Sequence, residues 1–274
     1  MLNDPYDSEW LDELRQLASA GTGDAKLYFL IDGAFKPGFY RQVIKETKVE
    51  NYALLFETLP SCSEAVKDVS PFLLQYDATQ HSSFEILQQC SGHPMVSVIE
   101  TTETLDELTS RMAPWCIVYS DQQRFNFRFA DTRRLPDIFS ALNGDQKSQI
   151  TGPALKWSYI DRQGQWLNLP IEASDNAAIS TWPELSDSQF AMLVGASETD
   201  EMLERISRRQ HLPNELPSRL YDAISQALRI STNKGLESGP LLRWCVSCID
   251  NLSSLSDEAL AQEFLSWQEN KALI

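Results

Sequence analysis

The chain has 274 residues, of which 42% are hydrophobic and 23% are charged, which is enough apolar material for one large or two smaller packed domains. This composition excludes the intrinsically disordered class, which combines few apolar residues with high charge. A formal net charge of −16 repels phosphate backbones and anionic membrane surfaces, so we expect no nucleic acid and no membrane among the partners.

Features of the N-terminus and the cysteines indicate the compartment. The first residues carry acids where a signal peptide needs a basic region followed by an apolar one. The longest apolar runs are far shorter than the roughly 20 residues that span a bilayer. Five cysteines are an odd number, which favours free thiols in a reducing compartment over a disulfide framework. We therefore expect a cytoplasmic protein.

An amphipathic helix and a buried strand are the first predicted elements. Over residues 4–20, Trp10, Leu14 and other apolar residues recur at helical spacings with acids between them. Leu27–Asp32 is a short apolar run stopped by Gly33, which predicts a buried strand. Further strands are predicted at Ala53–Glu57, Phe72–Tyr76, Met95–Glu100, Trp115–Tyr119 and Arg124–Phe129.

Helices are predicted between these strands, at Ser82–Cys90, Thr104–Met112 and Leu135–Leu142. Asn143-Gly144 is expected to close the last helix, since both residues tolerate the backbone of a helix C-terminus. Strands alternating with helices indicate an α+β (mixed α/β) domain with a central sheet flanked by helices. A hairpin predicted at Trp157–Leu169 finishes this domain.

After about Ser174 the pattern changes to helices alone. Helical spacing is found in the segments Ser188–Arg209, Pro217–Ile230, Pro240–Leu252 and Asp257–Trp267. A polar stretch near residues 172–181 separates the two patterns. We therefore predict a mixed α/β domain at residues 1–173 and a smaller all-helical lobe at residues 174–274.

Histidine spacing and nucleotide-binding motifs give no support to common enzyme classes. None of the three histidines, His81, His93 and His211, has a second histidine three or four residues away, as a zinc enzyme would need. The sequence also lacks GxSxG, Walker A and GxGxxG spacings, which mark hydrolases and nucleotide-binding proteins. We expect structural or surface histidines, no metal and no cofactor.

Cys245 and Cys248 match the CxxC pattern, which serves zinc binding, redox chemistry or simple packing. A structural zinc site needs four ligands, and no second pair accompanies this one. A redox pair normally lies at a helix N-terminus, whereas these residues lie inside a predicted helix beside Trp244. We favour packing of the two thiols as small hydrophobes and leave a redox role open.

Asp32-Gly33 lies after a predicted strand, a place where an α/β enzyme can hold an acid. No second carboxylate or metal motif accompanies it, so a turn or helix-capping role is favoured.

The stretch Arg124–Arg134 holds four arginines among three phenylalanines. Such a stretch can stack single-stranded nucleic acid, but the negative net charge opposes this use. Alternation predicts that all three phenylalanines lie on the buried face of a strand. Arg128 and Asp131 are predicted to form an internal bidentate pair at the turn into the next helix, with a partner-facing patch as the alternative.

Five motifs in chain order resemble the type VI secretion adaptor family, whose members are also called effector chaperones. Phe127–Leu135 (FRFADTRRL) resembles the family pattern "fRFyDPRvL", although Thr132 replaces the usual Pro. The other four are LYFLIDGA at 27–34, like "lyaLlDGA"; YALLFE at 52–57, like "waaLfegt"; SPFLL at 70–74, like "gPwLv"; and GPALKW at 152–157, like "fgPi..w". Phe72 stands where the family has Trp.

The resemblance covers roughly residues 25–160 and leaves the C-terminal lobe unmatched. Its motif residues, which we expect to be mostly structural, are Asp32, Gly33, Arg128, Asp131 and Arg134.

The resemblance implies a protein that is not an enzyme and uses no cofactor. Such adaptors bind a secreted effector, often through its N-terminal region, and help to load it onto the spike-tip protein of the secretion machine. We hypothesise that the two lobes form a groove that shelters an apolar effector segment. Trp182, Trp244 and Trp267 are the partner-binding candidates, because Trp often anchors interfaces, and packing between helices is their alternative role.

Two other functions are compatible with the sequence. An acidic protein of this size can be an immunity protein, which binds and neutralises a toxin. An enzyme with a thiol or carboxylate centre, at Cys248 or Asp32, is the third possibility.

Overall fold

The computed structural model describes residues 2–6, 10, 12–14, 16, 24–45, 47–59, 62–76, 82–176, 178–179, 181–232, 236–250 and 257–271. The chain forms two compact units, residues 1–193 and 194–274. We call them the αβ unit and the helical unit. This confirms the predicted fold class, an α+β part with a central sheet followed by an all-helical part.

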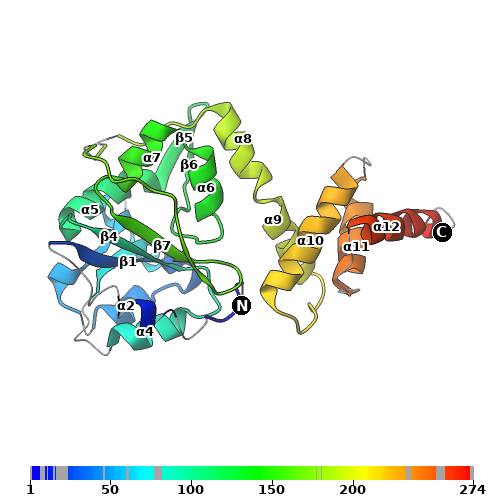
Figure 1. Ribbon diagram of the computed structural model, residues 1–274, viewed down its shortest axis with the longest axis horizontal. Coiled ribbons are helices and arrows are strands. Elements are labelled where there is room, and N and C mark those ends of the chain that lie inside the picture. The colour runs from blue at the N-terminus through cyan, green and yellow to red at the C-terminus, as the bar shows by residue number, and fades with distance from the viewer. Residues whose placement is uncertain are drawn as a thin grey trace. The chain divides into compact units, whose positions relative to one another are not determined.

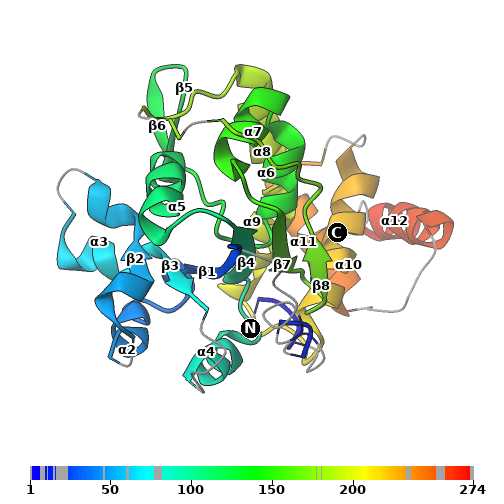
Figure 2. The ribbon, with the colours of Figure 1, turned by 60° about the vertical axis from the view of Figure 1, so that its left-hand side comes forward.

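A six-stranded antiparallel sheet forms the centre of the αβ unit, with the strand order β2-β3-β1-β4-β7-β8 (Figure 2). These strands are β1 (Lys26–Asp32), β2 (Tyr52–Leu54), β3 (Pro71–Gln75), β4 (Val96–Thr101), β7 (Lys156–Ile160) and β8 (Trp166–Asn168). The strands predicted around β1, β3 and β4 are thereby confirmed. The predicted strand at Ala53–Glu57 is shorter, because a 3-10 helix, η3 (Leu55–Thr58), replaces its second half.

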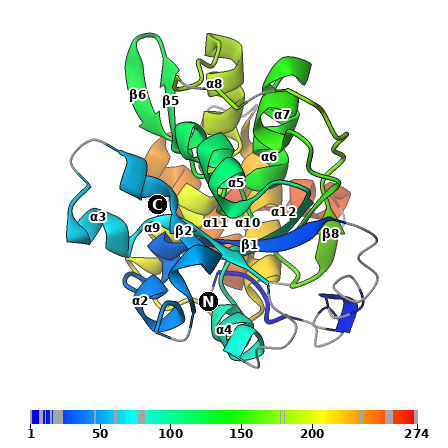
Figure 3. The same ribbon diagram turned by 90° about the vertical axis from the view of Figure 1, so that its left-hand side faces the viewer.

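Both faces of the sheet are covered by helices. Figures 1 and 3 show α5 (Leu105–Met112), α6 (Leu135–Ala141) and α7 (Gly144–Thr151) on one face, and α2 (Tyr40–Val43) and α4 (Ser82–Cys90) on the other. The alternation along β1 explains this arrangement, since Tyr28 and Leu30 belong to the first core while Phe29 and Ile31 belong to the second. A further helix, α3 (Glu64–Asp68), precedes β3.

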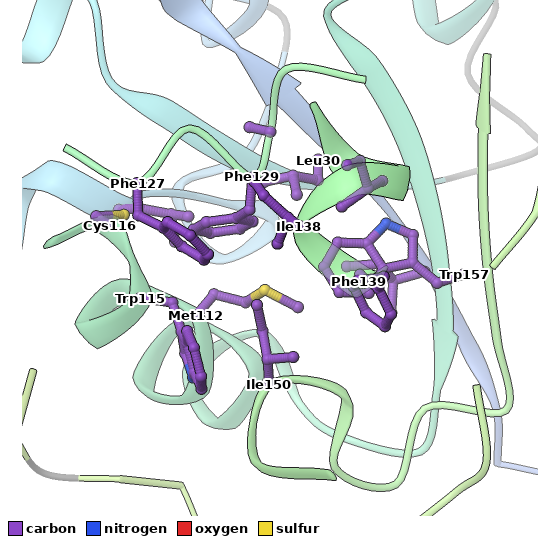
Figure 4. Close-up of a cluster of buried hydrophobic side chains, with 14 of the residues drawn as sticks. Leu30, Met112, Trp115, Cys116, Phe127, Phe129, Ile138, Phe139, Ile150 and Trp157 are labelled. Carbon is purple, nitrogen blue, oxygen red and sulfur yellow. The ribbon is translucent and has the colours of Figure 1, made fainter. Parts of the chain in front are cut away.

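Aromatic side chains fill the core beneath α5 and α6 (Figure 4). Trp157 of β7 contacts the rings of Phe129 and Phe139 edge to face, with centroid separations of 6.5 and 5.5 Å. Its indole N–H also donates to the Ser97 hydroxyl of β4 at 3.0 Å. Trp157, which belongs to the sequence motif at 152–157, therefore joins β4 and β7 to α6 and to the segment before it.

Hydrogen-bonded caps begin α5 and α7. Thr104 accepts a hydrogen bond from the Glu107 backbone N–H, and the Glu107 carboxylate accepts one from the Thr104 backbone. Asn143 and Gln146 form the same reciprocal pair at α7. Asn143 was expected to end the preceding helix, and α7 was not predicted, because Asn and Gly occur at both kinds of helix end.

The arginine- and phenylalanine-rich stretch begins in a separate two-stranded hairpin of β5 (Ile117–Ser120) and β6 (Gln123–Asn126). Asp121 and Gln122 form its turn with positive φ angles of 47° and 61°, as a two-residue hairpin loop requires. The predicted strand at Arg124–Phe129 was too long, since the chain turns at Phe127, where the Phe129 N–H donates to the Phe127 carbonyl. The predicted strand Trp115–Tyr119 also began too early, since Trp115 and Cys116 lie in η4 (Ala113–Cys116), before β5.

The hairpin predicted at Trp157–Leu169 is confirmed as β7 and β8. The N-terminal segment is attached to its turn, because the Asp4 N–H donates to the Arg162 carbonyl at 2.8 Å. Trp10 and Leu14 are buried against the α2–α4 face of the sheet. Helical backbone is seen at residues 10, 12–14 and 16, whereas residues 4–6 are not helical, so the predicted 4–20 helix began too early. Its remaining positions lie outside the described residues.

The helical unit packs its helices around a small core of its own. Its helices are α9 (Glu198–Ser207), α10 (Pro217–Ser231), α11 (Ser238–Asp250) and α12 (Asp257–Lys271), and α8 (Asp187–Gly195) contains the division between the units. The segments predicted as helical from Ser188 onward are confirmed, with the first divided into α8 and α9.

The division falls later than the predicted boundary near residues 172–181. Leu185 and Leu193 are buried in the α5–α6 core, and the Leu185 N–H donates to the Tyr119 carbonyl of β5. Residues 182–193 therefore pack as part of the αβ unit. Among the described residues, no helix is long and apolar enough to cross a membrane.

Candidate functional site

Four charged residues of the sequence motifs meet at the end of β1. Asp32 is the last residue of β1, whereas Arg128, Asp131 and Arg133 lie between β6 and α6. We call these four the arginine–aspartate cluster. Asp32 and Asp131 are buried, while Arg128 keeps 39% of its side chain exposed. The cluster joins parts of the sequence that are 96 residues apart.

Asp131 is held by Arg133 in a bidentate pair, with the Arg133 Nε and Nη2 donating at 3.0 and 2.8 Å. The predicted bidentate partner of Asp131 was Arg128, and this was wrong, since Arg133 takes that role. The Arg128 Nη2 lies 3.6 Å from Asp131 and makes its shorter contact, 2.9 Å, with the Asp32 carboxylate. Arg128 therefore connects two buried acids.

Asp32 caps the backbone that follows it. Its Oδ1 accepts from the Ala34 N–H at 2.9 Å at the start of η1 (Gly33–Phe35), which agrees with the expected capping role. Burial raises the pKa of this carboxyl above its usual value, and the Arg128 charge opposes that rise. The acid thus has defined partners on both oxygens.

Gly33 and Phe35 shape the outer side of the cluster. A Cβ atom at Gly33 would overlap the Ser70 carbonyl oxygen, so only glycine allows β1 to pass so close to the start of β3. The half-buried Phe35 ring has the guanidinium carbons of Arg128 and Arg133 at 4.9 and 5.3 Å from its centroid. This is an aromatic surface flanked by two cations.

The two remaining motif positions anchor the segment before α6. The Thr132 N–H donates to the Pro94 carbonyl at 3.0 Å, a bond that the proline usual at this position could not make. The Arg134 Nη2 donates to the Leu193 carbonyl at 2.6 Å. Both residues therefore fix the cluster's scaffold to neighbouring segments.

A second buried ion pair, which sequence reasoning missed, lies at the far end of β4. Arg111 Nε donates to Glu103 at 2.8 Å, and the two side chains are 7% and 8% exposed. The Arg111 Nη1 also donates to the carbonyls of Gln149 and Asn176, at 3.1 and 2.9 Å. Gly152 lies so close that a Cβ atom there would overlap the guanidinium.

This ion pair forms part of an open groove of about 580 Å³. Its lining combines acids of the first turn of α5 with residues of the loop after β8, including Asp106, Glu107 and Asp175. Backbone and side-chain hydrogen bonds from Thr104 lower the pKa of Glu107. No sequence pattern predicts the Glu103–Arg111 pair, because an acid and a base eight residues apart fit no short motif.

The thiols are packed away from solvent. Cys90, Cys116, Cys245 and Cys248 are buried and unpaired, and Cys62 is half-buried. Burial raises the pKa of Cys90, Cys245 and Cys248 to about 12. A thiol with so high a pKa carries almost no thiolate at neutral pH, and thiolate is the reactive form.

The three tryptophan candidates are not brought together. Trp244 is fully buried in the helical unit, where it contacts Phe264 and Trp267 and donates to the Ala227 carbonyl at 3.1 Å. Trp267 is half-buried in the same cluster. Trp182 lies in the αβ unit, half-buried beside Tyr119.

The two histidines that the structure describes, His93 and His211, form no site. His93 is half-buried, and burial lowers its pKa, while His211 is exposed and His81 lies outside the described residues. Within the part of the chain that the structure describes, no three His, Cys, Asp or Glu side chains are placed to hold a metal ion.

Comparison with protein families gives a match within the αβ unit. Residues 27–149 match the family described as "Domain of unknown function (DUF4123)". This segment contains the whole arginine–aspartate cluster and the Glu103–Arg111 pair, and it ends before β7. No curated protein and no solved structure matches the chain.

Proposed function

We propose that the protein is a non-catalytic adaptor that binds a type VI secretion effector and promotes its loading onto the spike-tip protein. The observation that carries this proposal is the DUF4123 match over residues 27–149, a family found in settings associated with type VI secretion effectors. It contains four of the five motifs that resemble the adaptor family, and the fifth, at 152–157, follows just after it.

The geometry of the motif residues supports a scaffold role. Asp32, Arg128 and Asp131 bond to one another and to neighbouring backbone, and Gly33 is required by close backbone packing. Side chains used in this way fix a surface and do not need a substrate to complete their contacts. The raised pKa values of the buried thiols likewise disfavour a thiol nucleophile.

Co-purification tests the proposal. The tagged chain, expressed with the products of its neighbouring genes, should retain a large effector and a spike protein. A deletion strain should make the effector but fail to deliver it to a target cell.

An immunity protein gives a different result in the same experiments. It would rescue a cell that expresses the effector, whereas an adaptor abolishes delivery without protecting. Rescue without a delivery defect, or no retained effector or spike protein, would overturn the proposal.

A further inference from the structure

The outer strand of the β5–β6 hairpin has an unpaired edge. β5 lies between β6 on one side and residues 183–185 on the other, where Tyr119 donates to Pro183 and accepts from Leu185. Figures 2 and 3 show the hairpin extending beyond α5, with β6 as its outermost strand. No segment that the structure describes flanks β6 in a comparable way.

The register identifies the free groups. The Phe127 N–H donates to the Cys116 carbonyl, so Phe125 and Gln123 are the β6 residues that bond to β5. Arg124 and Asn126 therefore direct their backbone N–H and C=O groups outward. In the described part of the chain, these four groups have no hydrogen-bond partner.

Edge strands normally carry protection against pairing, and the edge of the main sheet shows it. In β8 the outward positions are Trp166 and Asn168, and the next one is Pro170, which has no N–H to donate. β6, with the sequence Gln-Arg-Phe-Asn, contains no proline, so both of its outward residues keep a backbone N–H to donate. Its edge is open to an added strand.

Side chains on both faces of β6 are suited to an added strand. On one face the Arg124 guanidinium lies over the Trp182 ring at 5.7 Å, and Tyr119 lies beside that ring. On the other face the Phe125 ring contacts Phe190, with centroids 4.3 Å apart. A neighbouring strand would gain both aromatic surfaces.

The positive charge of Arg124 determines which kind of partner strand suits the β6 edge. Arg124 is exposed and forms no ion pair with any described residue, including Asp121 of the turn and Glu184 of the flanking segment. A second copy of the chain would bring the same arginine to this edge, and like charges on paired strands are destabilising, so self-pairing is disfavoured. A carboxylate opposite Arg124 would form a favourable cross-strand pair.

We propose that the outer edge of β6 is a docking site for an extended acidic segment of a partner protein, which adds as a strand and places a carboxylate against Arg124. Main-chain bonds would supply affinity and the side chains specificity, as in other strand-addition complexes. The proposal rests on the adaptor function, since it names the surface by which such an adaptor recognises a partner.

A capped peptide of alternating valine and glutamate serves as the probe, titrated at about 0.15 M salt, where distant charges are screened. It should bind the full chain and slow the hydrogen exchange of the Arg124 and Asn126 amides. The same peptide with N-methylated backbone amides should not bind, because it cannot pair. A valine–lysine peptide should bind more weakly than the valine–glutamate one.

Arg124→Glu should weaken binding of the acidic peptide by about threefold to tenfold. Arg243→Glu, an equal change of charge at an exposed arginine of the helical unit, is the matched control and should leave binding unchanged. Arg124→Pro removes an outward N–H and should abolish binding. Absence of peptide binding, undiminished binding of the N-methylated peptide, or equal effects of the two Arg→Glu variants would overturn the docking site.

The effector pull-down separates this inference from the adaptor function. If the wild-type chain retains the effector and Arg124→Glu and Arg124→Pro retain as much, the docking site fails while the adaptor function stands. If the wild-type chain retains no effector, the adaptor function fails, and the peptide titration alone decides whether the β6 edge accepts strands.

Discussion

The two units of the chain stabilise themselves with different kinds of buried side chain. The αβ unit buries Asp32, Glu103, Arg111 and Asp131 in paired arrangements. In the helical unit, every buried polar side chain that the structure describes is a hydroxyl, and aromatic rings around Trp244 form the core. Charges need defined partners, whereas apolar surfaces tolerate rearrangement, so the αβ unit should respond more sharply to single substitutions.

Removal of Arg111 is expected to have the largest effect. Arg111→Ala leaves Glu103 buried without its partner, which should lower the free energy of unfolding by about 3–5 kcal/mol. Urea unfolding monitored by tryptophan fluorescence measures this loss. The double variant Glu103→Leu/Arg111→Met should recover much of it, because apolar side chains of similar size can replace a buried pair. If Arg111→Ala lowers the free energy of unfolding by less than about 1 kcal/mol, the αβ unit does not respond more sharply than the helical unit.

In the helical unit, Trp244→Phe keeps an aromatic ring but removes the N–H that donates to Ala227. The unpaired carbonyl and the small gap should lower stability by about 1–3 kcal/mol. Hydrogen exchange should show faster opening in α10 and α11 and unchanged protection in β1. Equal loss of protection in β1 would show that the units unfold together.

Arg128→Ala tests the partly exposed pair of the arginine–aspartate cluster. At neutral pH we expect a loss of only about 1 kcal/mol, since 39% of the Arg128 side chain is in water. Without Arg128 the already raised pKa of Asp32 should rise further. A carboxyl whose pKa is raised in the folded state makes the fold less stable as pH rises through that pKa. The stability deficit of Arg128→Ala should therefore shrink when pH is lowered from 7 to 4.

The pH dependence of this deficit can be assigned to Asp32 with a second variant. Asp32→Asn and Asp32→Asn/Arg128→Ala both lack a titrating carboxyl at this position, so the stability deficit of the double variant relative to Asp32→Asn should be the same at both pH values. A deficit for Arg128→Ala that grows on acidification would contradict the assignment.

Thiol labelling of the unmutated chain has the smallest expected effect on stability. It compares the burial of the cysteines in the two units directly. With iodoacetamide near pH 8, the native chain should react at Cys62 alone, and all five cysteines should react after denaturation. Rapid native labelling of Cys248, with Cys90 still protected, would show that the helical unit opens on its own.

Local patterns allowed prediction of the elements but not of the pairs between them. The apolar run of β1 and the helical spacing of α10 were sufficient to find both. The phenylalanine alternation continued past the real end of β6, because a turn can bury Phe127 and Phe129 as well as a strand can. Asp32 and Arg128 are 96 residues apart, so no spacing rule could join them.

The distribution of Trp157's contacts has a practical consequence for work on isolated fragments. The matched segment ends at Gln149, but Trp157 occupies the space between Phe129 and Phe139 and bonds to Ser97 of β4. A recombinant piece cut at residues 27–149 would lack both β7 and β8 and would leave that aromatic surface open. Boundaries for expression should follow the sheet through residue 193, where the αβ unit ends.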